Sequence, residues 1–475
     1  MTTTSPPPRQ PVPVSLYEKQ RKVYPKAVMG YFARWRWAMV WLTQLVFYGL
    51  PWLHWNGRHA VLFDLDQRHF YVFGLVMQPQ DFIYLAALLI ISALLLFFVT
   101  ALAGRLWCGY ACPQTVYTEI FLWLERHTEG DRGARMRLDA QPWSGAKLLR
   151  KTAKHGAWLA VALYTGFTFT GYFIPIEALA AQMMALTLSP WATFWVFFYG
   201  FATYGNAGFM REQVCKYMCP YARFQSALSD MDTMVIAYDT ARGDPRGSRS
   251  RKADAKTLGL GDCIDCTLCV QVCPTGIDIR NGLQNECIAC AACIDVCDDV
   301  MGKMGDAPGL IRYSSGRGME QGLSRGQMLR RAVRPRVLIY GALLLGLSLG
   351  LLWSLSSRAD FSASITKDRG AMARVVGRGT VENTYRLQIA NSSEQPRTYR
   401  IGVSGLPGLQ LDSEASVAVA PTETATVPIR LVLPAGAAAG HAGESLPVNF
   451  EIQALPDAEA APRLTIRAVF MVPRG

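Results

Sequence analysis

The sequence predicts a multidomain membrane protein with five transmembrane α-helices, a cytoplasmic cysteine-rich domain and a C-terminal all-β sandwich. Three observations predict this fold class: long apolar runs, eight cysteines in two regularly spaced runs, and alternating apolar and polar residues between 359 and 475. The chain has 475 residues, of which 51% are hydrophobic. That length allows about three domains, and the apolar runs place part of the chain in lipid.

Five apolar runs are long enough to cross a bilayer, which takes about 20 residues. They are 37–55, Phe82–Ala103, 156–176, 191–210 and 337–357. The first run is the weakest because it contains Gln44 and Pro51. The preceding segment, 1–36, opens with the proline-rich stretch TTTSPPPRQPVPV and lacks the apolar core of a signal peptide, so we expect a disordered cytoplasmic tail.

The basic residues indicate an orientation in the membrane. Lysine and arginine gather in 19–36, 105–154 and 211–336, whereas 56–81 has two and 176–190 has none. Because positive loops stay in the cytoplasm, we expect the N-terminus inside and the C-terminus outside. The net charge of +12 therefore reflects topology. Anionic membrane lipid is the expected partner, and nucleic acid is not.

These features predict seven successive segments. They are a disordered tail (1–36), a four-span membrane domain (37–210), a cytoplasmic segment with a linker (211–257), an eight-cysteine domain (258–302), a basic cytoplasmic linker (303–336), a fifth transmembrane helix (337–357) and an external β-domain (358–475). Alternating segments at 384–391, 398–405, 426–433, 447–454 and 463–472 are separated by turn residues, which predicts an antiparallel sandwich. We find no catalytic cluster in it and expect a docking module.

Eight of the 12 cysteines form two runs with the spacing x2-x2-x3. The runs are Cys263, Cys266, Cys269 and Cys273, then Cys287, Cys290, Cys293 and Cys297. Three cysteines at this spacing wrap around one iron–sulfur cube, and the fourth cysteine of each run reaches the other cluster. We therefore assign one [4Fe–4S] cluster to Cys263, Cys266, Cys269 and Cys297, and a second to Cys287, Cys290, Cys293 and Cys273. Zinc is the alternative for paired C-x2-C motifs, but the doubled spacing is far more specific for iron–sulfur clusters.

This stretch, roughly 262–300, resembles bacterial-type ferredoxin domains. The resemblance implies an α+β fold and one-electron transfer through two [4Fe–4S] clusters. One departure is that Pro274 follows Cys273, whereas Asp298 follows Cys297. We expect the missing proline to change the stiffness of the loop and to leave ligation intact.

The other four cysteines lie in two copies of a C-x-Y-x-C-P element. CGYACP contains Cys108 and Cys112, and CKYMCP contains Cys215 and Cys219; each follows an apolar run on the cytoplasmic side. The i, i+4 spacing predicts that each pair shares one face of a helical turn. Because Pro113 and Pro220 would break or restart the helix, we expect four thiols at similar depth in one site.

Several chemistries suit four such thiols. Nearby Arg105, Arg211 and Lys216 would favour the thiolate form. Thiolates select soft Cu(I), so copper is one interpretation. A dithiol/disulfide redox pair and a further iron–sulfur centre are two others. Packing of the cysteines as small hydrophobic residues is the fourth, and the duplicated pattern argues against it.

The histidines exclude one cofactor and leave one metal site open. None lies in the middle of an apolar run, so we do not expect a membrane haem. His54, His59 and His69 share one external loop and could meet a metal, although a solvated loop is the more common explanation. We expect Asp81 and Glu177 at the membrane interface and His441 on the protein surface.

Together with YDTARGDPRG (238–247), CPTGIDIRNG (273–282) and CIDVCDDVM (293–301), these motifs resemble the cytochrome c oxidase accessory protein family CcoG, also called FixG or RdxA. The resemblance covers about 15–475. It implies a polytopic iron–sulfur protein of the bacterial cytoplasmic (inner) membrane with a periplasmic immunoglobulin-like domain. It also implies reduction of Cu(II) to Cu(I) for assembly of the cbb3-type oxidase.

The same resemblance implies roles for the cysteines and a set of partners. The eight ferredoxin cysteines would be cluster ligands. Cys108, Cys112, Cys215 and Cys219 would be the catalytic membrane-edge thiols of copper handling or electron transfer. Copper-handling proteins, oxidase assembly proteins and an electron donor would be partners. The alternatives are a membrane quinol dehydrogenase subunit of the nitrate- and nitrous-oxide-respiration type, and a redox-sensing scaffold without turnover.

Overall fold

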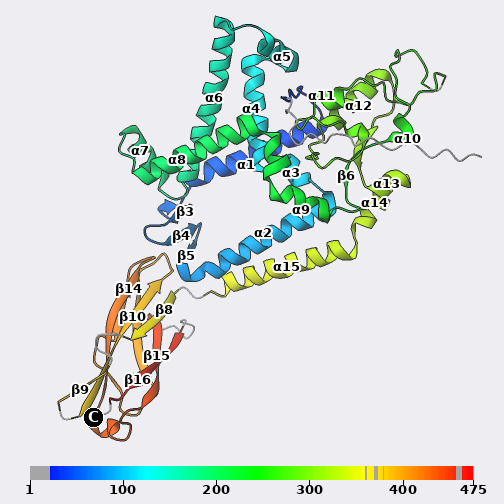
Figure 1. Cartoon of the computed structure of the whole chain (residues 1–475). Coiled ribbons are helices and arrows are strands. Elements are labelled where there is room, and N and C mark those ends of the chain that lie inside the picture. The colour runs from blue at the N-terminus through cyan, green and yellow to red at the C-terminus, as the bar shows by residue number, and fades with distance from the viewer. Residues whose placement is uncertain are drawn as a thin grey trace, which may run out of the picture. The chain divides into compact units, whose positions relative to one another are not determined.

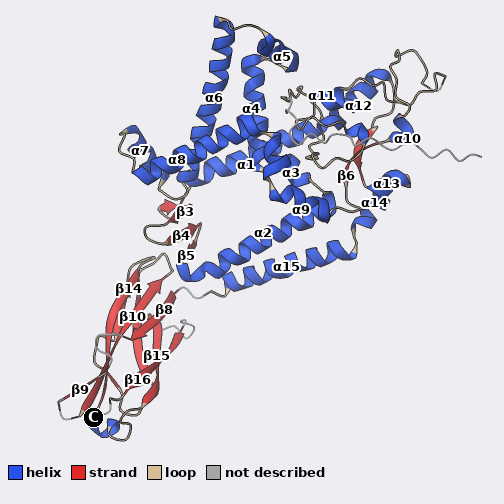
Figure 2. Ribbon diagram, viewed as in Figure 1, coloured by secondary structure: helices blue, strands red, loops and turns tan. Residues whose placement is uncertain are grey.

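The computed structural model describes residues 22–255, 257–358, 361–367, 373–377, 379–455 and 463–473 (Figure 1). The chain divides into two compact units. One comprises Met1–Val46, Leu95–Phe167 and Thr193–Gly341, and the other comprises Phe47–Leu94, Thr168–Ala192 and Ala342–Gly475. Helices dominate the first unit, and most strands belong to the second (Figure 2). Of the predicted tail, 1–21 lies outside the described residues.

Helix α1 (Tyr31–Gly49) begins six residues before the predicted span at 37, so the predicted tail extends too far. The backbone amides of Phe32 and Ala33 donate to the Asp295 carboxylate, at N–O distances of 3.0 and 2.7 Å. A carboxylate at a helix N-terminus satisfies free amides and complements the helix dipole. Gly30 lies against the same side chain, and a Cβ at this position would overlap the Asp295 carboxyl group. The start of α1 therefore depends on a residue far away in the sequence.

The remaining helices of the membrane-side part are α2 (Phe82–Ala103), α3 (Leu106–Tyr110), α4 (Pro113–Glu129), α5 (Arg132–Ala140), α6 (Gly145–Thr170), α8 (Pro190–Thr203), α9 (Pro220–Leu228) and α15 (Pro335–Ser356). Helix α2 coincides with a predicted apolar run, α6, α8 and α15 overlap three others with shifted ends, and α3, α4, α5 and α9 lie outside the predicted runs. A π-helical segment, Tyr204–Met210, continues α8. Within the described residues, α2 and α15 are the two helices long and apolar enough to cross a membrane. The count of five spans stays a prediction.

A small α+β domain contains the two cysteine runs. Strands β6 (Val235–Tyr238) and β7 (Ile311–Ser314) pair antiparallel and bring the two ends of this region together. Between them lie α10 (Thr240–Gly243), α11 (Leu268–Gln271), a 3-10 turn (Ile279–Asn281) and α12 (Ala292–Met304), with α13 (Gly316–Glu320) and α14 (Arg325–Ala332) following β7. The core packs Ile236, Ile279, Ile294, Met301 and Leu310 around Cys263 and Cys269. The ferredoxin-like domain is thus present where the cysteine spacing predicts it.

A buried ionic cluster joins α4 to its neighbours in the first unit. Glu125 is 2% exposed and forms ion pairs with Arg135 and Arg211, at N–O distances of 2.5 and 2.7 Å. One turn later, Glu129 pairs with Lys151 at 2.9 Å and Lys154 at 3.0 Å. Burial by itself raises the pKa of Glu125, but Arg211 and Arg135 outweigh it and hold that pKa below its usual range. Cations from three different segments therefore converge on one helix.

The second unit opens with short strands before α2. A 3-10 turn (Leu50–Trp52) leads into β1 (His54–Trp55) and β2 (Arg58–His59), which pair with each other. Strands β3 (Val61–Asp64), β4 (His69–Val72) and β5 (Leu75–Met77) form an antiparallel meander, followed by the turn Pro79–Asp81. Helix α7 (Ile176–Met184) belongs to the same unit, and the amide of Phe63 donates to the carbonyl of Tyr172 at 2.7 Å near its start.

The C-terminal part is the predicted antiparallel sandwich. One sheet has the order β12-β14-β10-β8, with β9 on β10, and the other β13-β11-β15-β16. The strands are β8 (Phe361–Lys367), β9 (Arg374–Val376), β10 (Thr380–Asn391), β11 (Arg397–Ser404), β12 (Gln410–Leu411), β13 (Ser416–Val419), β14 (Thr424–Leu433), β15 (Ser445–Leu455) and β16 (Arg463–Met471), with the short helix α16 (Ala435–Ala438) between β14 and β15. Alternate side chains form the core, among them Tyr385, Leu387, Ile389, Val448, Phe450 and Ile452. This alternation is the pattern that the sequence displays.

Candidate metal centre

The first predicted set of ligands meets around one cavity. Cys263, Cys266, Cys269 and Cys297 all line one small cavity, together with Tyr238 and Arg280. Cys269 lies on α11 and Cys297 on α12, and these helices pack against each other. The fourth cysteine of the second run therefore lies beside the first three cysteines of the first run. The spacing predicts this grouping of thiols; that the four hold one cluster stays a prediction.

The second predicted set also converges, inside the same domain. The pKa of Cys293 lies well above its ordinary value because of burial and because Cys290, Cys287 and Cys273 lie close by. Burial likewise raises the pKa of Cys287 to about 12, with Cys290 and Cys273 adding to the effect. Burial disfavours the negatively charged thiolate, which is the form that binds a metal. A bound cation would compensate for this cost. Both sets therefore have the donor chemistry of an iron–sulfur cluster held by four thiolates.

The two cysteine loops share an unusual backbone conformation. Asp265 and Thr267 flank Cys266 with φ of 54° and 57°, and Ala289 and Ala291 flank Cys290 with φ of 54° and 61°. A positive φ is uncommon for residues other than glycine, and such residues gather at functional sites. The loops therefore curl in the same way at the same position in each run. This repeated strain is a structural sign of a shared function that the residue types do not reveal.

The C-x-Y-x-C-P elements fold differently from the prediction. Cys108 lies on α3, but Cys112 caps α4 in an extended conformation, with φ −62° and ψ 127°. Cys219 caps α9 with φ −79° and ψ 110°, and Cys215 lies in a π-helical turn, Val214–Met218. The prediction that each pair shares one helical face is therefore wrong. The helix breaks before the second cysteine, because the residue preceding a proline is driven out of the α region.

The prolines act as the sequence predicts. Pro113 and Pro220 occupy the first turn of α4 and α9, where a missing amide hydrogen costs nothing. Each element thus places one cysteine on a helical turn and the second at the start of a new helix.

The four thiols of these elements form one group. Burial, together with the nearby Cys112, Cys108 and Cys219, raises the pKa of Cys215 to about 12. Burial also raises the pKa of Cys108 to about 11, despite the lowering effect of Arg105. Arg105 lowers the pKa of both thiols, as the sequence predicts, but burial outweighs this effect. We call Cys108, Cys112, Cys215 and Cys219 the edge site.

The arginines near the edge site have other partners. The guanidinium of Arg105 donates to the carbonyl of Ala222 at 2.8 Å and to that of Asn285. Arg211 pairs with Glu125 instead of approaching a thiol. A residue that the sequence analysis missed, Gln225 on α9, is fully buried, and its amide nitrogen lies 3.3 Å from Cys108 Sγ. No pattern in the sequence marks Gln225, because only the fold brings it to Cys108.

The edge site lies directly against the second cysteine loop. A Cβ on Gly109 would lie 2.7 Å from the carbonyl oxygen of Ile288 and 2.9 Å from the carbonyl carbon of Ala289. Only glycine allows the CGYACP backbone to approach the loop of Cys287 and Cys290 so closely. Arg36 also donates to the carbonyl of Cys290 at 2.6 Å. Cys215 and Cys290 line one common cavity.

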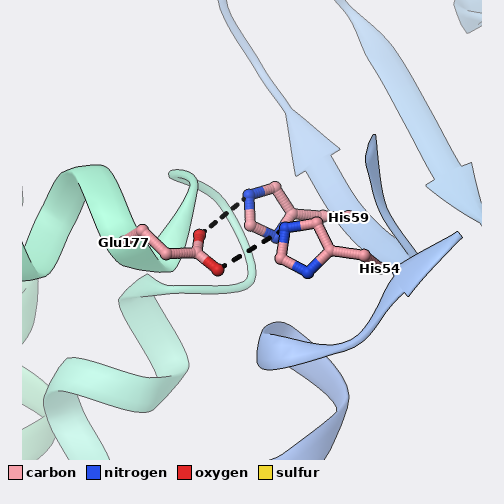
Figure 3. A group of neighbouring side chains, drawn as sticks. All are labelled: His54, His59 and Glu177. Atoms are coloured by element: carbon pink, nitrogen blue, oxygen red, sulfur yellow. Dashed lines mark ion pairs between the residues drawn. The ribbon is translucent and has the colours of Figure 1, made fainter. Parts of the chain in front are cut away.

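The external histidines belong to the second unit, where two of them meet an acidic residue. His54, His59 and Glu177 bring three ligand atoms within 4.8 Å of one another (Figure 3). His69 is not in this group, and Glu177, which the sequence analysis placed at the membrane interface, joins it instead. His441 pairs with Glu444 at 2.8 Å and is half exposed, as expected for a surface residue.

Two iron–sulfur family models together match the eight-cysteine domain and both C-x-Y-x-C-P elements. A family model of a 4Fe-4S dicluster domain matches residues 210–316, which contain the eight-cysteine domain and CKYMCP. A second model, a 4Fe-4S binding domain, matches residues 85–129, which contain CGYACP. Residues 351–473 match the immunoglobulin-like fold found at the C-terminus of FixG.

Whole-length relatives agree with these matches. The nitrogen fixation protein FixG of Rhizobium meliloti is 38% identical over 461 residues, covering 89% of this chain and 88% of that protein. Protein RdxB of Cereibacter sphaeroides is 39% identical over 440 residues, covering 90% and 92%. A crystal structure of a FixG-related protein from Vibrio parahaemolyticus is 21% identical with a TM-score of 0.21, covering 24% of this chain and 98% of that chain. Because FixG and RdxB are 38% and 39% identical to this chain over about nine-tenths of their length, the chain belongs to the FixG/RdxA family of iron–sulfur proteins.

Proposed function

We propose that this chain is a membrane-bound electron-transfer protein that reduces Cu(II) to Cu(I) for assembly of a cbb3-type cytochrome c oxidase. The observation that supports it is the contact of the edge site with the loop of Cys287 and Cys290. Soft thiolates retain Cu(I), the product of one-electron reduction of Cu(II). The substrate ion would gain one electron at the edge site, and a reduced cytoplasmic protein or a membrane quinol would supply it.

The protein's own residues would bind the clusters, shield the product ion from water and align the edge site. The eight ferredoxin cysteines would hold two [4Fe–4S] clusters, which supply one-electron transfer when bound. Partial burial of Cys108 and Cys215 would keep water away from the product ion. Gln225 would orient Cys108 through its amide, and Gly109 would keep the edge site close to the cysteine loop.

We also propose the five-span topology, with α1, α2, α6, α8 and α15 crossing the bacterial cytoplasmic membrane. Basic residues beside these helices support a cytoplasmic ferredoxin domain and a periplasmic β-sandwich. Copper-handling proteins, oxidase assembly proteins and anionic lipid are the proposed partners.

Two other chemistries remain candidates, each with a specific reason. The match of residues 85–129 to a 4Fe-4S binding domain favours a third cluster at the edge site over copper. The paired C-x3-C-P elements are also similar to those of membrane quinol dehydrogenase subunits, which would pass electrons from quinol to another protein.

A copper reduction assay separates these functions. The purified chain, with both clusters reduced and excess reductant removed, is mixed with Cu(II) and a chelator specific for Cu(I). We expect about two Cu(I) per chain, one electron from each cluster. The folded chain with both clusters oxidised serves as the control. Oxidation of quinol without any Cu(I) signal would favour the dehydrogenase instead.

Enlarging Gly109 tests the contact between the edge site and the cysteine loop. Gly109→Ala should destabilise the protein by about 1–3 kcal/mol, because the added methyl group meets rigid backbone. Copper reduction should slow, since the edge site is pushed away from the loop. Thermal unfolding and the copper assay measure the two effects.

Gly302→Ala is the matched control. Gly302 lies on α12, and among the described residues no atom comes within 4 Å of the point that its Cβ would occupy, apart from its own helix backbone and chain neighbours. Alanine there should be neutral or stabilise by up to about 1 kcal/mol. Equal behaviour of the two alanine variants would show that the contact at Gly109 does not matter.

A further inference from the structure

Two histidines of the second unit are placed opposite each other by a tight hairpin. In β1 and β2, His54 faces His59 across the antiparallel pair, and Trp55 faces Arg58. The connecting residues Asn56 and Gly57 have φ of 50° and 78°. Two positive φ values are the mark of a type I′ turn, for which Asn-Gly is the preferred sequence. The turn therefore fixes the register that brings the two imidazoles to one side, with ring centroids 4.8 Å apart.

A carboxylate from another segment faces both rings. Glu177 lies in the first turn of α7, and its two oxygens approach one imidazole each (Figure 3). The distances are 3.5 Å to His54 Nε2 and 3.1 Å to His59 Nε2. Ligand atoms at about 2.1 Å from one metal lie roughly 3.4 Å apart in a tetrahedron. One ligand atom from each of the three side chains lies within 4.8 Å of the others, so the group would contract slightly around an ion. The three side chains thus have the spacing of a metal-binding group.

The hydrogen bond on the far side of His59 fixes its tautomer. Nδ1 of His59 lies 3.1 Å from the carbonyl oxygen of Pro51. A carbonyl oxygen only accepts, so Nδ1 carries the proton and the Nε2 of a neutral ring presents a lone pair toward Glu177. At 3.1 Å, that nitrogen and the carboxylate oxygen are joined either by a proton, as in an ion pair, or by a metal ion bound to both. A histidine held through its second nitrogen in this way is typical of metal ligands.

The hairpin is held in place by further contacts within the second unit. The amide of Ala60 donates to the carbonyl of Leu53 at 2.7 Å, which closes the hairpin base. Arg58 pairs with Glu394 of the β10–β11 loop at 2.7 Å, and Asn56 donates to the same carboxylate. The site is therefore built on an anchored turn and a helix start, not on a free loop.

We propose that His54, His59 and Glu177 form a binding site for a divalent first-row transition-metal ion. Two imidazoles and a carboxylate suit Cu(II) and Zn(II), whereas Cu(I) prefers sulfur ligands. His59 is 13% exposed at its side chain, but His54 and Glu177 are 53% and 46% exposed, which leaves coordination positions open to water. The ion would therefore exchange with solution. The site does not depend on the proposed copper reduction.

Titration of the full-length, cluster-loaded chain in detergent tests the site. The background carries Cys108→Ser and Cys215→Ser, so that the edge site does not take the added ion. We expect one Zn(II) per chain by calorimetry, tighter binding of Cu(II), and no binding of Mg²⁺. The electron paramagnetic resonance spectrum of bound Cu(II) should show coupling to two nitrogens.

Three variants decide whether the named side chains hold the ion. His59→Ala should abolish binding, and the isosteric Glu177→Gln should weaken it at least tenfold. His441→Ala removes a surface histidine that pairs with Glu444 and should change nothing. Unchanged iron content and unfolding temperature show that each variant is folded. Absence of 1:1 binding in the parent, or equal affinity in Glu177→Gln and the parent, would overturn the site and leave a plain histidine–carboxylate ion pair.

Discussion

Serine at both Cys108 and Cys215 is expected to reduce the rate of the proposed Cu(II) reduction at least about a hundredfold, because the ion would lose two of the four thiol ligands proposed for it. The iron content should stay at about eight per chain, four for each ferredoxin cluster. Burial raises the pKa of both thiols, so without a metal they stay protonated at neutral pH. Binding of a cation would release the protons. Metal and sulfide analysis, together with the copper assay, measures both quantities.

The outcome also separates copper from a third cluster at the edge site. Wild-type protein with about twelve irons, falling to about eight in the double variant, would assign these thiols to a further [4Fe–4S] centre and contradict the copper site. Normal copper reduction by the double variant would remove the edge site from the mechanism. Tyr217→Phe, at a residue of CKYMCP that is 71% exposed, is the matched control and should behave like wild type.

Replacing Glu125 by glutamine is expected to destabilise the first unit by about 3–5 kcal/mol, because it leaves buried cations without their counter-charge. Glu125 is 2% exposed and joins Arg135 to Arg211. The guanidinium of Arg211 and the ammonium of Lys154 also lie over the Trp158 ring, so the disruption should spread to this packing. Thermal unfolding in detergent, followed by circular dichroism, measures the loss.

The pH dependence of stability follows from the same residue. The folded-state pKa of Glu125 lies below its unfolded value, so its ion pairs contribute stability at neutral pH. That contribution is lost as the pH falls through the folded-state pKa, and Glu125→Gln should lack this part of the acid sensitivity. Asp299→Asn is the control: Asp299 forms an exposed pair with Lys303, and its loss should cost less than about 0.5 kcal/mol. A similar loss in both variants would contradict the role of burial.

Several predictions that came from local patterns agree with the structure. The alternation in 384–391 and 447–454 becomes β10 and β15, because a period of two puts one set of side chains into the core. The x2-x2-x3 spacing brings Cys297 to Cys263, Cys266 and Cys269, since three cysteines at this spacing encircle a cluster and leave the fourth outside the loop. Pro113 and Pro220 start helices for a reason that is local to the proline ring.

One prediction failed for a local reason, and two failed because they needed information from elsewhere in the chain. The i, i+4 spacing of Cys108 and Cys112 suggested one helical face, but Pro113 holds the preceding Cys112 in an extended conformation. Arg211 was expected to favour a thiolate, yet the oppositely charged Glu125, 86 residues away, binds it instead. The start of α1 depends on the carboxylate of Asp295, and no pattern within residues 1–36 predicts that contact.

The sequence by itself determined the elements and the chemistry that each could support: apolar runs, paired cysteine motifs and a β-sandwich, all encoded by residues near one another along the chain. Only the tertiary structure decided which of these groups meet. Gly109 lies against the Ile288–Ala289 backbone, Gln225 reaches Cys108, and Glu177 joins His54 and His59. The physical reason is that ligation and ion pairing act over a few ångströms in space, and folding sets those distances between residues that are far apart in sequence.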